Sequence, residues 1–275
     1  MKMGAKVTRR TLLGGLAVSA CWAGMGISPA RADQLDDLMK SGKIRVSTDV
    51  AIPPAGMLDA QMRPVGSDVE TAQLLAKDWG LQLELVPTIG ATRIPNVLTG
   101  KADIIISTLS VTPEREKIID FSRAYTILQS VVAGPANTAV NSVEGLKGMT
   151  VAVTRGTTQD TKLSGLASAN GFTLRRYDDD ATLVTAAASG QATLMASSVA
   201  LVNAVAQKNP DLKFAPRFVL DNFDIAIGVR KGEGQLVAKL NEWILANLQN
   251  GKLNEIYKKY YNVDLPASLR PPEVR

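Results

Sequence analysis

The residues with the clearest chemistry are an arginine and three hydroxyl side chains around one expected turn. A buried strand is predicted to end at Ser107. The run 112–114 (Thr-Pro-Glu) predicts a helix start, because Thr caps helices, Pro suits the first helical position and Glu favours the first turn. Free backbone N–H groups at such a start attract anions, and Arg115 adds a guanidinium one turn later. The hydroxyl donors are those of Ser107, Thr108 and Ser110. The pattern predicts a site for a carboxylate group.

A second turn further along the chain has the same composition. A strand over 150–153 leads through Gly156, which permits a left-handed turn, to the hydroxyl residues Thr157 and Thr158 at another helix start. The first turn alone fits an ordinary capped helix equally well, with Arg115 pairing with Glu114 or Asp120 on the surface. The two turns together favour a carboxylate that is shared across a closing cleft.

Charge and composition exclude several functional classes. The chain has 31 basic and 26 acidic residues, and five of the basic but none of the acidic residues lie within 1–32. Residues 33–275 therefore carry 26 of each sign and give no reason to expect a nucleic-acid or membrane-surface partner. The absence of histidine excludes Ser-His-Asp and Cys-His nucleophiles and histidine-ligated zinc. We predict no metal, no cofactor and no catalytic residue, although carboxylates and lysines remain available for acid–base chemistry.

The N-terminal segment that carries the charge excess is typical of an export signal. A basic start, an uncharged apolar run over 12–27 and small residues before Ala32 predict cleavage after Ala32 and a periplasmic protein. The apolar run is too short and Gly-rich for a membrane span. Residues 8–13 resemble a twin-arginine motif, with an ordinary basic signal as the alternative. Lipidation at Cys21 is less favoured, because Trp22 and further apolar residues follow it.

Short β-branched runs alternate with amphipathic stretches, which is typical of an α/β fold with mainly parallel strands. Strands are predicted at 44–47, 83–86, 103–106, 150–153 and 193–196. Helices are predicted from Asp68, over 93–99, from Thr157, from Ser198, and along 236–248 and 253–260. Two further apolar strands, 127–133 and 224–229, are interpreted as crossings between two lobes. Residues 33–126 with 224–275 would form lobe 1, and residues 127–223 lobe 2.

These motifs resemble one known family over nearly all of residues 33–275. The Ser-x-Thr-Pro-x-Arg element at 110–115 and the Gly-Thr-Thr-Gln element at 156–159, in this order, are the most specific. The sequence resembles the family 3 bacterial solute-binding proteins, the type II periplasmic components of amino-acid ABC transporters. The resemblance implies a two-lobed type II periplasmic binding protein fold with two hinge crossings. It also implies a monomer that holds a small carboxylate ligand, such as an amino acid, and meets an ABC permease in the inner membrane.

The resemblance implies roles for single residues as well. The arginine matching Arg115 binds the ligand α-carboxylate. The hydroxyl positions that assist it are Ser107, Thr108, Ser110, Thr157 and Thr158. Asp68 lies in a family motif, and we predict that it caps a helix and does not contact the ligand.

Two positions depart from the family pattern. Ile52 stands where an aromatic usually precedes Pro-Pro, so a stacking wall is lost. Ser198 stands where the family commonly has the Asp that pairs with the ligand ammonium, so the usual counter-charge is missing. The carboxylates that could replace it are those of Asp49, Asp180 and Asp224.

A further motif bears on the ligand's charge. Residues 91–95 (Ala-Thr-Arg-Ile-Pro) resemble a variant found in binders of acidic amino acids, in which Arg93 would meet a second carboxylate. The alternative is a solvated arginine at a helix start. We therefore expect the ligand to be an amino acid or a related carboxylate. Two narrower expectations are that it is acidic, or that it lacks the usual ammonium group.

Two other functions fit the same resemblance. Some dehydratases that act on prephenate- or arogenate-like acids share this scaffold and use cleft arginines, and they are the alternative from the enzyme class. A sensor that presents its ligand to a chemoreceptor would have the same sequence features as a transport component.

Overall fold

The computed structural model describes residues 34–270. The predicted export signal, its cleavage point, the twin-arginine motif and Cys21 lie outside the described residues. Within 34–270, no helix is both long enough and apolar enough to span a membrane.

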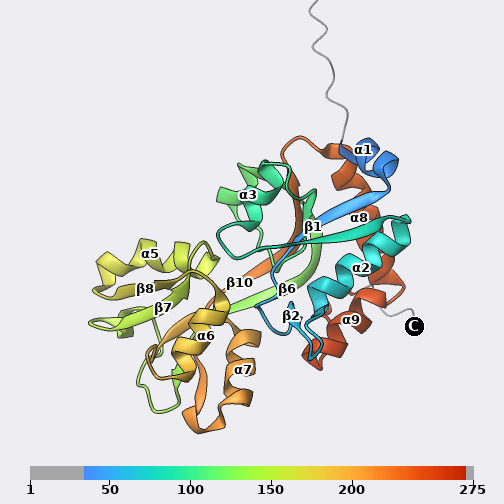
Figure 1. The fold of residues 1–275 in the computed structure, drawn as a ribbon. Coiled ribbons are helices and arrows are strands. Elements are labelled where there is room, and N and C mark those ends of the chain that lie inside the picture. Colours follow the sequence, from blue (N-terminus) through green and yellow to red (C-terminus); the bar gives the residue numbers. More distant parts are fainter. Residues whose placement is uncertain (1–33, 271–275) are drawn as a thin grey trace, which may run out of the picture. The chain divides into compact units, whose positions relative to one another are not determined.

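One eight-stranded sheet organises the described chain (Figure 1). In sheet order the strands are β4 (Gln82–Pro87), β1 (Lys43–Thr48), β5 (Ile104–Ile105), β10 (Phe214–Arg230), β6 (Ile119–Pro135), β9 (Met195–Ser198), β7 (Thr150–Thr154) and β8 (Thr173–Tyr177). The predicted α/β class is confirmed. The prediction of mainly parallel strands holds for β4–β1–β5 and for β9–β7–β8. It is wrong at the centre, where β10 and β6 are antiparallel to each other and to β5 and β9.

Helices connect the strands in both outer groups. They are α1 (Gln34–Ser41), α2 (Ser67–Trp79), α3 (Arg93–Leu98), α4 (Pro113–Glu116), α5 (Thr158–Asn170), α6 (Asp180–Ala188), α7 (Val199–Lys208), α8 (Gly234–Gln249) and α9 (Lys252–Tyr261). A small hairpin of β2 (Met57–Leu58) and β3 (Pro64–Val65) precedes α2. The predicted helices correspond to α2, α3, α4, α5, α7, α8 and α9. Strand β8 and helix α6 were not predicted.

The two strands interpreted as crossings are much longer than the sequence indicated. β6 and β10 each have 17 residues and lie side by side, from the pair Ile119 and Arg230 to the pair Pro135 and Phe214 (Figure 1). Polar residues interrupt the apolar pattern, and tertiary pairing extends the strands through them. Each strand is buried along only part of its length. In the middle of β6, for example, Ile127, Leu128 and Gln129 are half-buried.

The apolar cores separate along this strand pair. One set of buried side chains comes from 38–125 and 225–265, and it packs α2, α8 and α9 against the sheet. A second set comes from 131–220 and packs α5, α6 and α7 around β7 and β9. The bounds of the two predicted lobes stay a prediction. For the site, this arrangement means that the loops after β1 and β5 rest on one core and the loops after β7 and β9 on another.

Candidate functional site

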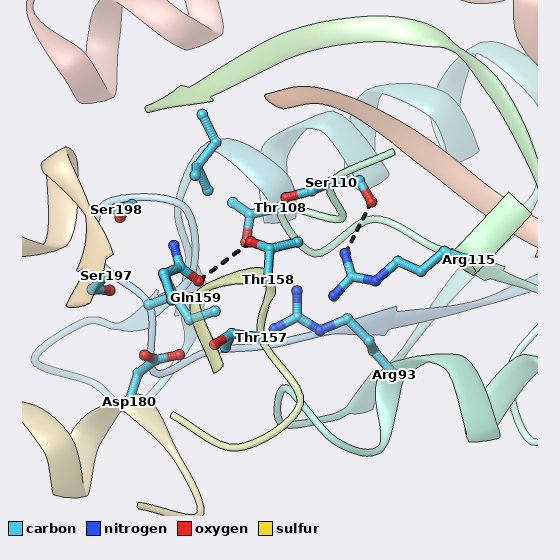
Figure 2. A pocket seen from close by; sticks show the side chains of 12 residues that line it. Arg93, Thr108, Ser110, Arg115, Thr157, Thr158, Gln159, Asp180, Ser197 and Ser198 are labelled. Carbon is cyan, nitrogen blue, oxygen red and sulfur yellow. Dashed lines mark hydrogen bonds between the residues drawn. The ribbon is translucent and has the colours of Figure 1, made fainter. Parts of the chain in front are cut away.

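A polar pocket gathers side chains from both sets of strands (Figure 2). It is lined by Ile52, Arg93, Thr108, Ser110, Arg115, Leu128, Thr157, Thr158, Gln159, Asp180, Ser197 and Ser198. Of the predicted site residues, Ser107 and Asp49 do not line it, and all the others do. About 30 Å³ of the pocket is free, so the lining side chains lie close together.

Arg115 lies in this pocket and forms no ion pair among the described residues, although the charge of its neighbour Glu114 acts on it. Its Nη1 donates to the carbonyl oxygen of Ser110 at 2.9 Å, and its Nη2 donates to that of Gly156 at 3.3 Å (Figure 2). Asp120, a possible surface partner, instead pairs with Lys231 at 2.6 Å. Burial, followed by the nearby positive charge of Arg93, lowers the pKa of Arg115 to about 10, so the side chain is still charged at neutral pH. The guanidinium is therefore a cation whose strongest available partner is an external anion.

The helix that was expected to support Arg115 is too short for that role. α4 has only four residues, and Thr112 caps it by accepting the N–H of Arg115 at 3.3 Å. A single turn has no appreciable macrodipole. The macrodipole therefore adds little at this helix start, and the predicted anion site depends mainly on the Arg115 side chain; it stays a prediction.

Arg93 begins α3 and is buried, with 4% of its surface exposed, which contradicts the interpretation of a solvated arginine. Its Nη1 donates to the carbonyl oxygen of Ser107 at 2.6 Å, while its buried Nε has no partner. Burial raises the pKa of Asp49, and the positive charge of Arg93 opposes that rise. Asp49 lies outside the pocket lining, and one of its carboxylate oxygens is buried without a hydrogen bond. Arg93 thus faces a buried carboxylate on one side and the pocket on the other.

The turn after β5 is held by residues behind the pocket. The Ser107 hydroxyl accepts the N–H of Asp49 at 3.1 Å, which explains why Ser107 is turned away from the pocket. Thr108 has a φ of 44°, a left-handed value that is costly for a residue with a Cβ. Its N–H donates to Asp68 at 2.7 Å, and the hydroxyl of Tyr125 donates to the same carboxylate at 2.8 Å. Burial raises the pKa of Asp68 to about 6.

The prediction that Asp68 caps a helix is wrong. α2 begins at Ser67 and its N-cap is Gly66, with no side-chain cap. The Asp68 side chain points instead across the structure to the turn after β5, where it stabilises the strained conformation of Thr108. Asp68 therefore acts as a positioning residue for a pocket wall.

The turn after β7 brings its own hydroxyl groups to the pocket. Gly156 has a φ of 75°, and a Cβ there would lie 2.9 Å from the Cα of Ala91, so only glycine fits. Thr157 caps α5 by accepting the N–H of Asp160 at 3.2 Å. The Thr158 hydroxyl donates to the side chain of Gln159 at 3.4 Å (Figure 2). Gln159 was not predicted as a lining residue, although it belongs to the Gly-Thr-Thr-Gln element.

Of the three carboxylates considered as replacements for the missing Asp, Asp180 alone lines the pocket. It is the first residue of α6, it is 4% exposed, and it accepts a hydrogen bond from Thr154 at 2.7 Å. Burial raises its pKa to about 6, against the hydrogen bond from Thr154, which lowers it. Ser198 caps α7 by accepting the N–H of Leu201, so its hydroxyl is partly committed to the helix.

The pocket is therefore polarised. The two guanidiniums lie on one side, and Asp180 lies with Ser197 and Ser198 on the other (Figure 2). Such an arrangement can bind a molecule with an anionic end and a cationic end. Residues 34–270 contain no cluster of three side chains suited to hold a metal ion.

Comparison with known proteins identifies a family and similar structures. The model of the bacterial extracellular solute-binding proteins, family 3, matches residues 44–263. The L-cystine-binding protein TcyJ of Escherichia coli (strain K12) is 27% identical over 95% of this chain and 98% of its own length. The structure of a solute receptor for L-cysteine of Neisseria gonorrhoeae is 30% identical, with a TM-score of 0.77 over 87% of this chain and 97% of the receptor. A second similar structure is that of AncCDT-1, an ancestral amino acid-binding protein and precursor of cyclohexadienyl dehydratase. It is 28% identical, with a TM-score of 0.75 over 83% of this chain and 99% of AncCDT-1.

We expect the carboxyl group of Asp180 to titrate near pH 6 in the free protein, well above the usual value of 3.8. The folded protein then keeps a proton that the unfolded chain releases, so this group makes folding less favourable as pH rises from about 4 to about 6. Carbon NMR of the Asp180 side chain measures the midpoint directly. Thr154→Val should raise it further, because the hydrogen bond that favours the ionised form is lost. A midpoint near 4 would contradict the proposed burial of the carboxylate.

Proposed function

Because the chain belongs to the bacterial extracellular solute-binding proteins, family 3, we propose that it binds an amino acid for delivery to an ABC importer. The observation that carries the proposal is that the guanidinium of Arg115 and the buried carboxylate of Asp180 lie on opposite sides of one small pocket. Arg115 would hold the ligand α-carboxylate, and Asp180 would hold the ammonium. Relatives named for L-cystine and L-cysteine support an amino-acid ligand.

Electrostatics supports a zwitterionic ligand. The charge of Arg93 is offset by Asp49, which is buried close enough for the guanidinium to affect its pKa. Arg115 and Asp180 are then left as one positive and one negative group for the ligand. A charge buried without a partner costs several kcal/mol, so a ligand with both charges is favoured over one with a single charge.

Ligand binding would replace contacts that the pocket makes with itself. Arg115 donates to two backbone carbonyls, and the bond to Gly156 is long at 3.3 Å. A carboxylate accepts from a guanidinium in a shorter, charge-assisted geometry, and each such bond contributes about 1.5–3 kcal/mol. Because about 30 Å³ of the pocket is free, the contact between Arg115 and Gly156 must open to admit the ligand head group.

We propose the two predicted lobes, 33–126 with 224–275 and 127–223, as the parts that move. Two features support this division: the apolar cores separate within a few residues of these bounds, and among the described strands β6 and β10 run through both parts. The contact between Arg115 and Gly156 joins residues of different lobes. The protein would work as an exported monomer in the periplasm and present the closed form to its permease.

A dehydratase acting on a prephenate- or arogenate-type acid is the second candidate. The observation in its favour is Asp180, because a buried pocket carboxyl with a pKa of about 6 is suited to general-acid catalysis. The likeness to a precursor of cyclohexadienyl dehydratase supports the scaffold, and that precursor is itself described as amino acid-binding. Steady product formation from prephenate or arogenate would establish this candidate in place of the binding protein.

Replacing Arg115 tests the proposed carboxylate grip. Arg115→Ala should lower the affinity for the native amino acid by about 2–5 kcal/mol, because one partner of a desolvated charge pair is removed. The fold should persist, since Arg115 makes no ion pair within the described chain. Isothermal titration calorimetry measures the affinity and thermal melting without ligand checks the fold. Arg123→Ala, at an exposed position on β6, is the matched control. Unchanged affinity in Arg115→Ala would refute the grip.

Replacing Arg93 tests whether the ligand is an acidic amino acid whose second carboxylate binds this arginine. If Arg93 meets a second carboxylate, Arg93→Gln should lower the affinity for glutamate far more than for glutamine, its neutral isostere. If Arg93 is balanced by Asp49 and only supports the α-carboxylate, both ligands should lose affinity equally. Thermal-shift titration with both ligands gives the comparison, since a ligand at 100 times its dissociation constant stabilises by about 2.7 kcal/mol. A variant in which glutamate retains its full affinity would exclude this role of Arg93.

A further inference from the structure

A second and larger cavity adjoins the polar pocket. It has a volume of about 260 Å³, against about 30 Å³ for the polar pocket. The two share four wall residues, Ile52, Thr108, Leu128 and Ser198, so they are neighbouring chambers of one site. A ligand held by Arg115 and Asp180 can therefore extend past these four residues into the larger chamber.

The larger chamber has no charged wall. None of its lining residues is an acid, a lysine or an arginine, and neither Arg93 nor Arg115 reaches it. Its far wall includes Tyr257 and Tyr261 of α9, whose rings stack with centroids 4.3 Å apart and planes at 15°. Pro53 and Pro54 form another part of the wall. A charged group placed here would lose its water without gaining an oppositely charged partner, which is unfavourable. An apolar or aromatic group would be favoured.

The loop between β1 and β2 supplies one wall of the chamber. Ile52 and Gly56 bond to each other in both directions, at 2.9 and 3.0 Å, and keep this loop closed on itself. A Cβ on Gly56 would lie 1.8 Å from the carbonyl oxygen of Asp49, so the two ends of the loop approach each other as closely as glycine alone allows. Ile52 itself lines both chambers. This part of the chamber wall is thus fixed by contacts within the loop itself.

We propose that this apolar chamber receives the side chain of the amino acid, and that the substrates are large neutral amino acids, with aromatic ones preferred. The proposal rests on the proposed function, because it needs the α-carboxylate at Arg115 and the ammonium at Asp180. The size is appropriate: a cavity of about 150 Å³ holds benzene in another protein, so about 260 Å³ accommodates a phenyl or phenol ring with room to spare. A second carboxylate or a guanidinium on the side chain would find no oppositely charged partner in the chamber.

The experiment compares four probes, L-phenylalanine, L-alanine, L-glutamate and L-arginine, by calorimetry on the purified protein. We expect phenylalanine to bind most tightly. Filling the chamber with Ala200→Phe, near the start of α7, should then lower the affinity for phenylalanine by about tenfold or more, a typical loss for a hydrophobic subsite, and leave alanine unaffected. Asn203→Phe adds the same ring at an exposed position of the same helix and should change neither affinity.

The outcomes separate this inference from the proposed function. If Arg115→Ala abolishes binding of every probe but Ala200→Phe does not weaken phenylalanine, the grip stands and the chamber proposal is overturned. Tighter binding of glutamate or arginine than of phenylalanine also overturns it. Binding of no probe at all contradicts the proposed function itself. If Ala200→Phe melts at a much lower temperature, Val199→Phe fills the chamber from the adjacent residue and replaces it in the comparison.

Discussion

The structure depends on keeping two guanidiniums charged in a small, largely desolvated space. Burial lowers the pKa of Arg115, and Arg93 lowers it further, yet no acidic side chain of the described chain forms an ion pair with either group. Backbone carbonyls of Ser107, Ser110 and Gly156 take up some of their donors. Carbonyl oxygens carry only partial charges, so they offset desolvation incompletely. The charge of Arg115 is the one left without an ion pair on its side of the pocket, and a ligand carboxylate complements it better than carbonyl oxygens do.

Three buried carboxylates near the guanidiniums offset part of their positive charge. Asp49, Asp68 and Asp180 are all buried near the guanidiniums, but each is held away from direct pairing by its own hydrogen bonds. Burial raises the pKa of all three, which shows that their desolvation is only partly compensated. The guanidiniums belong to helices on one side of the long strand pair β6 and β10, and Asp180 belongs to a helix on the other side. One ligand can therefore complete the charge balance across the pocket.

The sequence was informative where function is local and uninformative where it depends on tertiary contacts. Hydroxyl-rich turns, the glycine at 156 and the helices starting at 158 and 199 follow from capping and turn preferences, so they could be predicted. Asp68 looked like a helix cap because of its position, but its partners, Thr108 and Tyr125, are 40 and 57 residues away. Asp180 begins an alanine-rich helix with little amphipathic pattern. The cap by Asp179 was the available signal for that helix, whereas the bond with Thr154 that places the carboxylate was not visible in the chain.

The central claim is that Asp180 recognises the ligand ammonium opposite Arg115. Calorimetry with the tightest-binding amino acid and its des-amino analogue, on the wild-type protein and on Asp180→Asn, tests it most directly. The account predicts that the wild type prefers the amino acid by about 1.5–3 kcal/mol, the value of a charge-assisted hydrogen bond, and that Asp180→Asn loses this preference. If Asp180→Asn discriminates between the two ligands as strongly as the wild type does, Asp180 is not the partner of the ammonium.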